Sequence, residues 1–242
     1  MSPTPLPEPW AGDRVESMSK IRAITSYRMV ESKHTSAHVT TVFEVDLTRI
    51  ARLRVARKGE FEKAGVKLTF LPFIVQAVTQ GLRKFPVLNA AVRGNDIIFR
   101  QSVNIGLAVA LDWGLIVPVL KRADELSLLG LGRGINDLAE RARTKKLTPD
   151  EVQGGTFSIT NYGVKGSLIG TPIIPQPQVA ILGLGAIEKR PKVVTGPDGE
   201  DTIAIRTCAY FALSFDHRII DGSDADGFMT DVKKFCEAFP EG

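Results

Sequence analysis

The spacing of apolar residues near the C-terminus predicts a long strand that ends at a histidine. Apolar side chains occupy every second position there, at Ala209, Phe211, Leu213 and Phe215. A period of two is typical of a strand, and it brings His217 into register with the apolar face. We therefore expect a strand over 203–215 and an imidazole that points into a packed surface.

Helical spacing of apolar residues and the signals at segment ends predict helices along the rest of the chain. They cover 15–30, a segment capped by Thr48 and weakened by Gly59, a segment opened by Thr69 and Pro72, 126–146, and a last segment carrying Phe228, Val232, Phe235 and Phe239 on one side. The third of these has the clearest buried face, made of Phe70, Phe73, Ile74, Ala77, Val78 and Leu82. Phe85-Pro86 is expected to end it.

Further strands are predicted where β-branched residues or alternation dominate. They cover 39–45, a hairpin turning at Arg93-Gly94-Asn95-Asp96, an unbroken strand from Val103 to Leu111, an apolar segment over 115–120 buried on both faces with Pro118 at an edge, 156–160, 179–184 and 191–194. Helices at both ends of a strand-rich centre predict one α/β (α+β layered) domain with a large mixed β-sheet flanked by helices.

Composition narrows the class of protein without identifying it. The 242 residues are 43% hydrophobic and 24% charged, enough for a substantial core. The net charge is +4 and the basic residues are dispersed apart from 49–58, which makes nucleic-acid binding a weak alternative and suits an anionic or phosphorylated small molecule. Cys208 and Cys236 lie far apart in no metal spacing, so we expect a reducing compartment. No apolar run reaches the length of a membrane span, so we expect no membrane association.

The first residues have the composition of an extended linker. Prolines stand at positions 3, 5, 7 and 9 among residues that have little to pack. We expect 1–14 to be a Pro-rich linker remnant of a truncated chain and 15–242 to be the folded domain.

Two groups of polar residues are candidates for chemistry. His217 lies among Asp216, Arg218 and Asp221, a concentration of charge at a strand end where sites are often built; the alternative is a satisfied core histidine. Thr156, Ser158 and Thr160 share one face of a predicted strand between glycines at 154–155 and 163. The glycines favour close backbone approach, whereas the alternative is an exposed strand face.

Several motifs in order resemble the catalytic domain of the dihydrolipoyl acyltransferases, which are components of 2-oxoacid dehydrogenase complexes and share the chloramphenicol acetyltransferase-like fold. The resemblance rests on Arg28-Met29-Val30-Glu31-Ser32, Gly114-Leu115-Ile116-Val117-Pro118-Val119, the 154–163 segment, Gly170-Thr171-Pro172-Ile173-Ile174, Pro177-Gln178-Val179-Ala180-Ile181-Leu182-Gly183 and Asp216-His217-Arg218-Ile219-Ile220-Asp221-Gly222. It extends from about Val15 to Phe239.

The resemblance implies acyl transfer between a dihydrolipoyl thiol and coenzyme A. It makes His217 the general base that activates the thiol and Thr160 the hydroxyl that stabilises the tetrahedral oxyanion. Asp221 would hold the geometry and charge balance of the site, while its alternative is a turn residue or helix N-cap. The lipoyl group would be carried on a domain absent from this chain. No residue that contacts coenzyme A is assigned.

The resemblance also implies a homotrimer with the active site at the subunit interface, the histidine of one chain facing the hydroxyl of its neighbour. Expected partners are a lipoyl domain and the decarboxylase and dihydrolipoamide dehydrogenase components, in bacterial cytoplasm or a mitochondrial matrix equivalent. Apolar residues over 115–119 would line the channel. The chain ends at Phe239-Pro240-Glu241-Gly242 without the leucine run usual in this family, so we expect assembly to stop at the trimer.

Other assignments stay open or are weak. The acyl group is acetyl, succinyl or branched-chain, with Tyr162, Val164 and Lys165 as contributors to its pocket. The alternatives to the enzyme are an inactive core or scaffold subunit and a free-standing CoA-dependent acetyltransferase. His34 and His38 are four residues apart but have no acidic or cysteine partner, so no metal site is predicted. Arg28 is expected on a solvated helix face.

Overall fold

The chain folds around one mixed sheet whose elements follow the sequence patterns closely. The computed structural model describes residues 6–111 and 114–241; positions 1–5 of the expected linker lie outside the described residues. The helices are α1 (Lys20–Thr35), α2 (Thr48–Ala56), α3 (Lys58–Lys63), α4 (Leu71–Lys84), α5 (Leu128–Arg143) and α6 (Gly222–Glu237). Short 3-10 turns are η1 (Pro86–Asn89), η2 (Ala123–Glu125), η3 (Pro149–Val152) and η4 (Gly163–Lys165).

The main sheet combines parallel and antiparallel strands. The strands of the chain are β1 (His38–Asp46), β2 (Ala90–Arg93), β3 (Asp96–Phe99), β4 (Ile105–Leu107), β5 (Val109–Leu111), β6 (Gly114–Ile116), β7 (Val119–Leu120), β8 (Phe157–Asn161), β9 (Ala180–Leu184), β10 (Glu188–Thr195) and β11 (Asp201–Asp216). Within the described residues, seven of them form one sheet in the order β1-β11-β9-β8-β4-β7, with β10 added to β11. The β4-β8 and β8-β9 pairs are parallel and the others antiparallel, which confirms the predicted large mixed sheet.

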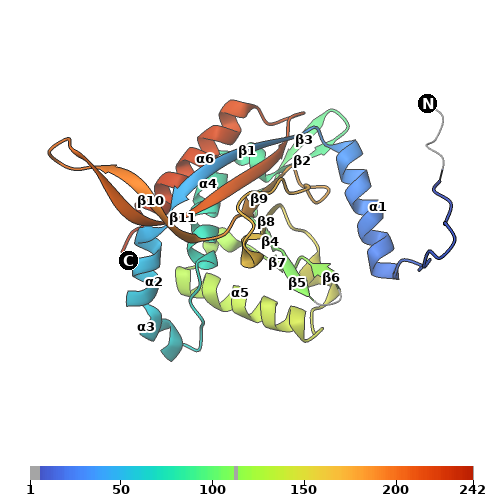
Figure 1. The fold of residues 1–242 in the computed structure, drawn as a ribbon, viewed down its shortest axis with the longest axis horizontal. Coiled ribbons are helices and arrows are strands. Elements are labelled where there is room, and N and C mark those ends of the chain that lie inside the picture. Colours follow the sequence, from blue (N-terminus) through green and yellow to red (C-terminus); the bar gives the residue numbers. More distant parts are fainter. Residues whose placement is uncertain (1–5, 112–113, 242) are drawn as a thin grey trace.

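The core lies between this sheet and helices α4 and α6. The predicted apolar face of α4 is buried, with Phe73 and Ile74 fully covered, and α6 packs on both α4 and β1 (Figure 1). The rings of Phe157 on β8 and Phe228 on α6 are 5.8 Å apart. Burial of these aromatic side chains helps to hold the helices on the sheet.

The prediction of one unbroken strand from Val103 to Leu111 is wrong, because β4 and β5 are separate strands. The chain leaves the main sheet after β4, and β5 pairs instead with β6 in a separate two-stranded sheet. The prediction that 115–120 is buried on both faces is also wrong, because Leu115 is 57% exposed. Pro118 does precede the outermost strand of the sheet, β7, as expected of a residue without an N–H group.

Two predicted helix starts differ from the structure. The first helix begins at Lys20 rather than at residue 15, with the Ser19 hydroxyl as its cap. The Thr48 side chain does not cap α2; its hydroxyl accepts a hydrogen bond of 2.8 Å from the backbone N–H of Thr207. A contact between distant segments replaces the local cap.

Two elements project from opposite ends of the molecule (Figure 1). The β10–β11 hairpin exposes Val193, Ile203 and Ile205 at 67%, 80% and 74%. Helix α1 exposes Ile21, Ile24, Tyr27 and Val30. In the part of the chain that the structure describes, no helix is both long and apolar enough to cross a membrane.

Candidate active site

His217 stands in an exposed turn directly after the longest strand. β11 ends at Asp216, and the His217 backbone N–H donates to the carbonyl of Ala37 at 2.8 Å. The imidazole lies 5.7 Å from the Phe215 ring and is exposed to solvent. The expectation that it points into a packed surface is therefore wrong: the strand pleat stops one residue earlier, where the chain turns away.

The residues on both sides of His217 are locked together. Asp216 is completely buried, and its carboxylate accepts hydrogen bonds from the Arg218 guanidinium at 2.7 to 3.1 Å and from the Arg218 backbone N–H at 3.1 Å. The same carboxylate accepts from the Ala37 N–H at 3.2 Å. A forked ion pair of this kind fixes orientation as well as charge. The backbone that carries His217 is thus held in one place.

The ion pair also controls the protonation of Asp216. Burial of the carboxylate is the largest single effect and opposes its ionisation, but the hydrogen bonds from Arg218 and Ser36 and the Arg218 charge together hold the pKa of Asp216 below its ordinary value. Asp216 is therefore a negative charge at neutral pH, and Arg218 neutralises it beside the imidazole.

Asp221 occupies the N-cap position of α6. This is the position expected under the alternative that Asp221 is a turn residue or helix N-cap. Its carbonyl accepts from the N–H groups of Asp224 and Ala225, each at 3.1 Å, but its side chain makes no capping bond. The carboxylate is exposed and makes no hydrogen bond to any described residue. Its side chain and that of His217 are not hydrogen-bonded to each other within the described chain.

Strand β8 begins at Phe157, one residue later than predicted, and of the hydroxyls of Thr156, Ser158 and Thr160 only that of Thr160 makes no hydrogen bond within the described chain. Thr156 accepts from the Asn104 N–H at 2.9 Å, and Ser158 donates to the Gln178 side chain at 2.8 Å; both are buried. The alternative of an exposed strand face is therefore wrong for these two. Thr160 is partly buried, and its hydroxyl makes no hydrogen bond within the described chain.

Glycines beside Thr160 permit the close approach that their positions predict. Thr160 pairs with Gly183 on β9, and a Cβ on Gly183 would stand 2.5 Å from the ring of Tyr162. A Cβ on Gly163 would stand 2.2 Å from the backbone of Ala186. Side chains at these positions would displace the segment that follows Thr160.

One chain does not bring His217 and Thr160 together. Thr160 aligns with Gly183, and Gly183 aligns with Ala212 on β11, five residues before His217. Two strand spacings and four residues of extended chain place the Cα atoms of Thr160 and Asp216 about 16 Å apart, and His217 follows Asp216 in the turn. A base and an oxyanion donor that act on neighbouring atoms of one substrate must each lie within about 3 Å of the atom they serve, so this separation favours contributions from two chains.

His38 is a functional residue of the fold whose role the sequence did not reveal. Its Nε2 accepts from the Ile174 N–H at 3.1 Å, so the ring proton lies on Nδ1, which faces the Ser36 carbonyl at 3.1 Å. His38 is also paired with Asp216 across β1 and β11. It fixes the segment around Ile174 close to the His217 turn.

The two-histidine face considered for metal binding does not exist as a helix face. α1 ends at Thr35, so exposed His34 belongs to the helix and His38 opens β1. Among the described residues, no group of three or more His, Cys, Asp or Glu side chains is arranged to hold a metal ion. Arg28 is exposed on α1, as expected.

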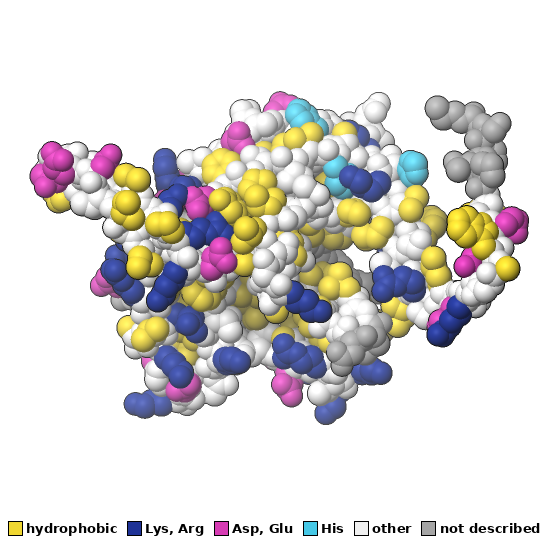
Figure 2. All heavy atoms as spheres, in the orientation of Figure 1, with side chains coloured by type: hydrophobic (Ala, Val, Ile, Leu, Met, Phe, Trp, Pro, Cys, Tyr) yellow, Lys and Arg dark blue, Asp and Glu magenta, His cyan; other side chains and the backbone are white. Residues whose placement is uncertain are grey.

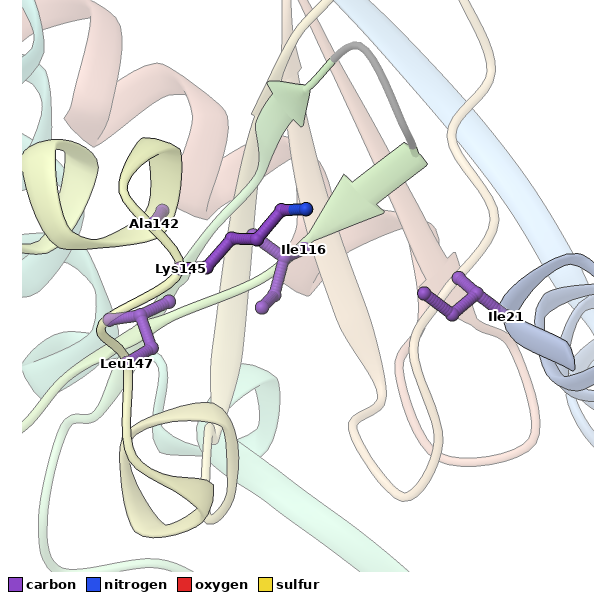
Figure 3. A pocket seen from close by; sticks show the side chains of 5 residues that line it. All are labelled: Ile21, Ile116, Ala142, Lys145 and Leu147. Carbon is purple, nitrogen blue, oxygen red and sulfur yellow. The ribbon is translucent and has the colours of Figure 1, made fainter.

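An apolar hollow of about 370 Å³ opens where α1 stands off the body. Ile21 of α1 faces Ile116 of β6 and Leu147 across it (Figure 3). None of the three predicted catalytic residues lines this hollow. Ile116 belongs to the segment 115–119 that is predicted to line the channel, so the hollow is an uncovered apolar surface of the single chain beside that segment.

Comparison with known proteins shows the family. Residues 11–241 match the family described as 2-oxoacid dehydrogenases acyltransferase (catalytic domain). The chain is 45% identical over 224 residues to the dihydrolipoyllysine-residue succinyltransferase component of the 2-oxoglutarate dehydrogenase complex of Bacillus subtilis, covering 92% of this chain and 53% of that protein. It is also 45% identical over 225 residues to the acetyltransferase component of the pyruvate dehydrogenase complex of Mycobacterium bovis, covering 92% of this chain and 41% of that protein.

Solved structures agree with the sequence relatives. A dihydrolipoamide acetyltransferase of Azotobacter vinelandii is similar with a TM-score of 0.90 and 34% identity, covering 98% of this chain and 97% of that one. A chloramphenicol acetyltransferase shares the fold, with a TM-score of 0.55 and 13% identity, covering 87% of this chain and 94% of that one. This confirms the predicted fold class. The chain spans about half the length of the curated relatives it matches, and it belongs to the catalytic-domain family of the 2-oxoacid dehydrogenase acyltransferases.

Proposed function

We propose that this chain transfers an acyl group between a dihydrolipoyl thiol and coenzyme A. Family membership and relatives that are named acetyl- and succinyltransferases support this activity. The observation that carries the proposal is the pair of separated half-sites: an exposed imidazole on a locked turn, and a partly buried hydroxyl that no described residue uses.

In the proposed reaction His217 takes the proton of the attacking thiol. The thiolate sulfur attacks the thioester carbonyl, and a carbon–sulfur bond forms as the carbonyl oxygen becomes an oxyanion. Thr160 donates a hydrogen bond to that oxygen. The bond to the leaving sulfur then breaks, and the imidazolium of His217 returns its proton to the leaving thiolate. No covalent enzyme intermediate is required, since both substrates are thiols or thioesters.

The complete site forms between subunits of a homotrimer in this proposal. The separation of about 16 Å between the Cα atoms of Thr160 and Asp216 within one chain, derived from strand geometry, supports contributions from two chains. The projecting hairpin and α1 lie at opposite ends of the molecule and expose apolar side chains, a head-to-tail arrangement that suits a closed ring. A structure titled as the cubic core of the pyruvate dehydrogenase multienzyme complex has a TM-score of 0.90 with this chain.

The partners and the acyl group of this chain are inferred from its family and its named relatives. A lipoyl domain would bring the acyl group, and the decarboxylase and dihydrolipoamide dehydrogenase components would complete the cycle. Named relatives divide between acetyl and succinyl transfer. Near Thr160, Val164 is 81% exposed and Lys165 is an exposed residue of η4, so a second subunit must complete any pocket that distinguishes the acyl groups.

The direct experiment measures acyl transfer to dihydrolipoamide from acetyl-, succinyl- and isobutyryl-CoA. We expect activity with at least one donor and its loss in His217→Ala. His34→Ala removes an exposed histidine elsewhere and serves as the matched control with unchanged activity. Equal rates for His217→Ala and the parent would contradict the general-base role, and inactivity with every donor would favour the scaffold alternative.

A further inference from the structure

Three polar side chains form a cluster beside the turn that carries His217. They are Ser32 and Ser36, at the end of α1, and Gln176, in the segment that leads to β9. Histidine side chains gather over this end of the molecule (Figure 2). Both serines are buried and Gln176 is half-buried. Buried hydroxyl groups in folded proteins are nearly always hydrogen-bonded, so the partners of this polar cluster show what it holds.

The chemistry of Asp216 fixes the direction of the hydrogen bonds in the polar cluster. An ionised carboxylate only accepts, so the Ser36 hydroxyl donates to Asp216. The Ser36 oxygen in turn accepts from the side-chain amide of Gln176 at 2.8 Å. The same amide lies 3.4 Å from the Ser32 oxygen, and the Ser32 hydroxyl donates to the Ile174 carbonyl at 2.5 Å. A chain of donors therefore runs from Gln176 through Ser36 to the Asp216 carboxylate.

The polar cluster acts on the same carboxylate that the Arg218 guanidinium binds. Arg218 reaches Asp216 from the turn, and Ser36 reaches it from the end of α1. The next residue, Ala37, donates its N–H to Asp216 at 3.2 Å and accepts the N–H of His217 at 2.8 Å. A displacement of Ser36 therefore moves an anchor of the His217 backbone as well as a donor to the carboxylate.

The segment 170–176 links the polar cluster to the other half-site of the same chain. At its start the Gly170 carbonyl accepts from the Tyr162 hydroxyl at 3.3 Å, and Tyr162 follows Thr160 by two residues. At its end it donates to the polar cluster. One segment is therefore hydrogen-bonded beside both half-sites.

We propose that Ser36 and Gln176 are positioning residues for His217. Gln176 fixes the Ser36 hydroxyl, and Ser36 holds the Asp216 carboxylate in the orientation that binds Arg218. Both act through Asp216 and not on the substrate. The inference rests on the proposed function, because it concerns the residue assigned there as the general base.

Steady-state acyl transfer to dihydrolipoamide tests the positioning role. Ser36→Ala removes one hydrogen bond to a charged group, so we expect kcat to fall by about 10-fold with KM unchanged. Ser36→Thr keeps the hydroxyl on an extended backbone, which a β-branched residue adopts readily, and is expected to retain most of the parent kcat. Ser102→Ala removes an exposed hydroxyl outside the polar cluster and is the matched control with unchanged kcat.

Gln176→Met is a second variant that keeps the length of the side chain without its N–H donor. The Ser36 hydroxyl then loses the partner that fixes it, so we expect kcat to fall again with KM unchanged. This variant tests the proposal even if Ser36→Ala fails to fold.

A double substitution tests whether Ser36 acts through Asp216. Residues of one hydrogen-bond network do not have independent effects, so adding Ser36→Ala to Asp216→Asn is expected to lower kcat by less than about 2-fold. A further loss of about 10-fold, the full effect of an independent site, would overturn the proposed path.

Amide hydrogen exchange tests the same link without measuring activity. The N–H groups of Ala37 and Arg218 donate to Asp216, so both are expected to exchange about 10-fold faster in Ser36→Ala than in the parent. The exchange rates do not depend on the general-base role, which His217→Ala tests separately. Parent-like kcat in both Ser36→Ala and Gln176→Met beside an inactive His217→Ala, a rise in KM in place of a fall in kcat, or unchanged exchange would overturn the proposal.

Discussion

At the scale of the residue, His217 is held by its neighbours in the chain rather than by bonds to its own ring. Asp216 and Arg218 form an ion pair around it, and the backbone N–H groups of Ala37 and His217 join the turn to the start of β1. The imidazole itself is left exposed and unbonded, which is the state a general base needs before a thiol arrives.

Asp216→Asn tests this arrangement. The amide cannot form the charge-assisted fork with Arg218, so we expect unfolding to become easier by about 2 kcal/mol. We also expect kcat to fall by about 100-fold, the cost of a misplacement on the order of 1 Å, with little change in KM. Glu60→Gln breaks a more exposed pair with Arg57 and is the control. An unchanged kcat in Asp216→Asn would show that the ion pair does not position His217.

The same ion pair predicts a specific sensitivity to acid. Because the pKa of Asp216 is lower in the folded chain than in the unfolded one, its ionised form stabilises the fold above the ordinary carboxyl pKa of about 4. That contribution is lost as the pH falls from there through the folded pKa. Thermal unfolding at a series of pH values is expected to show a smaller loss below about pH 4 in Asp216→Asn than in the parent; equal losses would contradict the linkage.

Thr160 on β8 and Thr156 directly before it have opposite expected phenotypes. Thr160→Ala is expected to lower kcat by the equivalent of about 3 kcal/mol, the value of one oxyanion donor, with unchanged stability because its hydroxyl has no bond in the described chain. Thr156→Ala leaves the Asn104 N–H without its acceptor, so it is expected to lower stability by about 1 kcal/mol. Thr160→Ser should retain most activity. Full activity of Thr160→Ala in steady-state assays would remove the oxyanion role.

At the scale of the element, the sequence predicts a helix or strand correctly where one face of it is buried, and incorrectly where its position depends on contact with a distant segment. The apolar face of α4 and the β2–β3 turn follow from local pattern. The unbroken alternation from Val103 to Leu111 hid a change of sheet, because a period of two does not identify the pairing strand. The outward position of His217 depends on the turn after β11, which alternation also does not encode.

The β10–β11 hairpin carries the prediction at this scale. Ile203 pairs with Val193, and both are exposed, so a neighbouring chain is expected to cover them. Ile203→Lys is expected to shift the chain from trimer to monomer in analytical ultracentrifugation and to abolish activity while the circular dichroism spectrum is retained. Val55→Lys replaces another exposed apolar residue, 69% exposed on α2, as the control. An intact trimer in Ile203→Lys would exclude the hairpin from the interface.

At the scale of the whole molecule, the central claim is that one active site is shared between two chains. The fold places an imidazole in the turn after β11 and an unused hydroxyl on β8, with about 16 Å between the Cα atoms of Asp216 and Thr160 by strand geometry. The family resemblance seen in the sequence predicted both residues, but the separation follows only from the register of β8, β9 and β11. If the proposed shared site is correct, oligomerisation is part of the chemistry.

Complementation between two inactive variants tests this claim most directly. His217→Ala and Thr160→Ala chains are each expected to be inactive alone. Coexpressed in equal amounts, they form mixed rings in which some interfaces combine an intact His217 with an intact Thr160, so about a quarter of the parent activity is expected to return in a closed head-to-tail ring. Mixed trimers that remain as inactive as either variant alone would contradict the shared site.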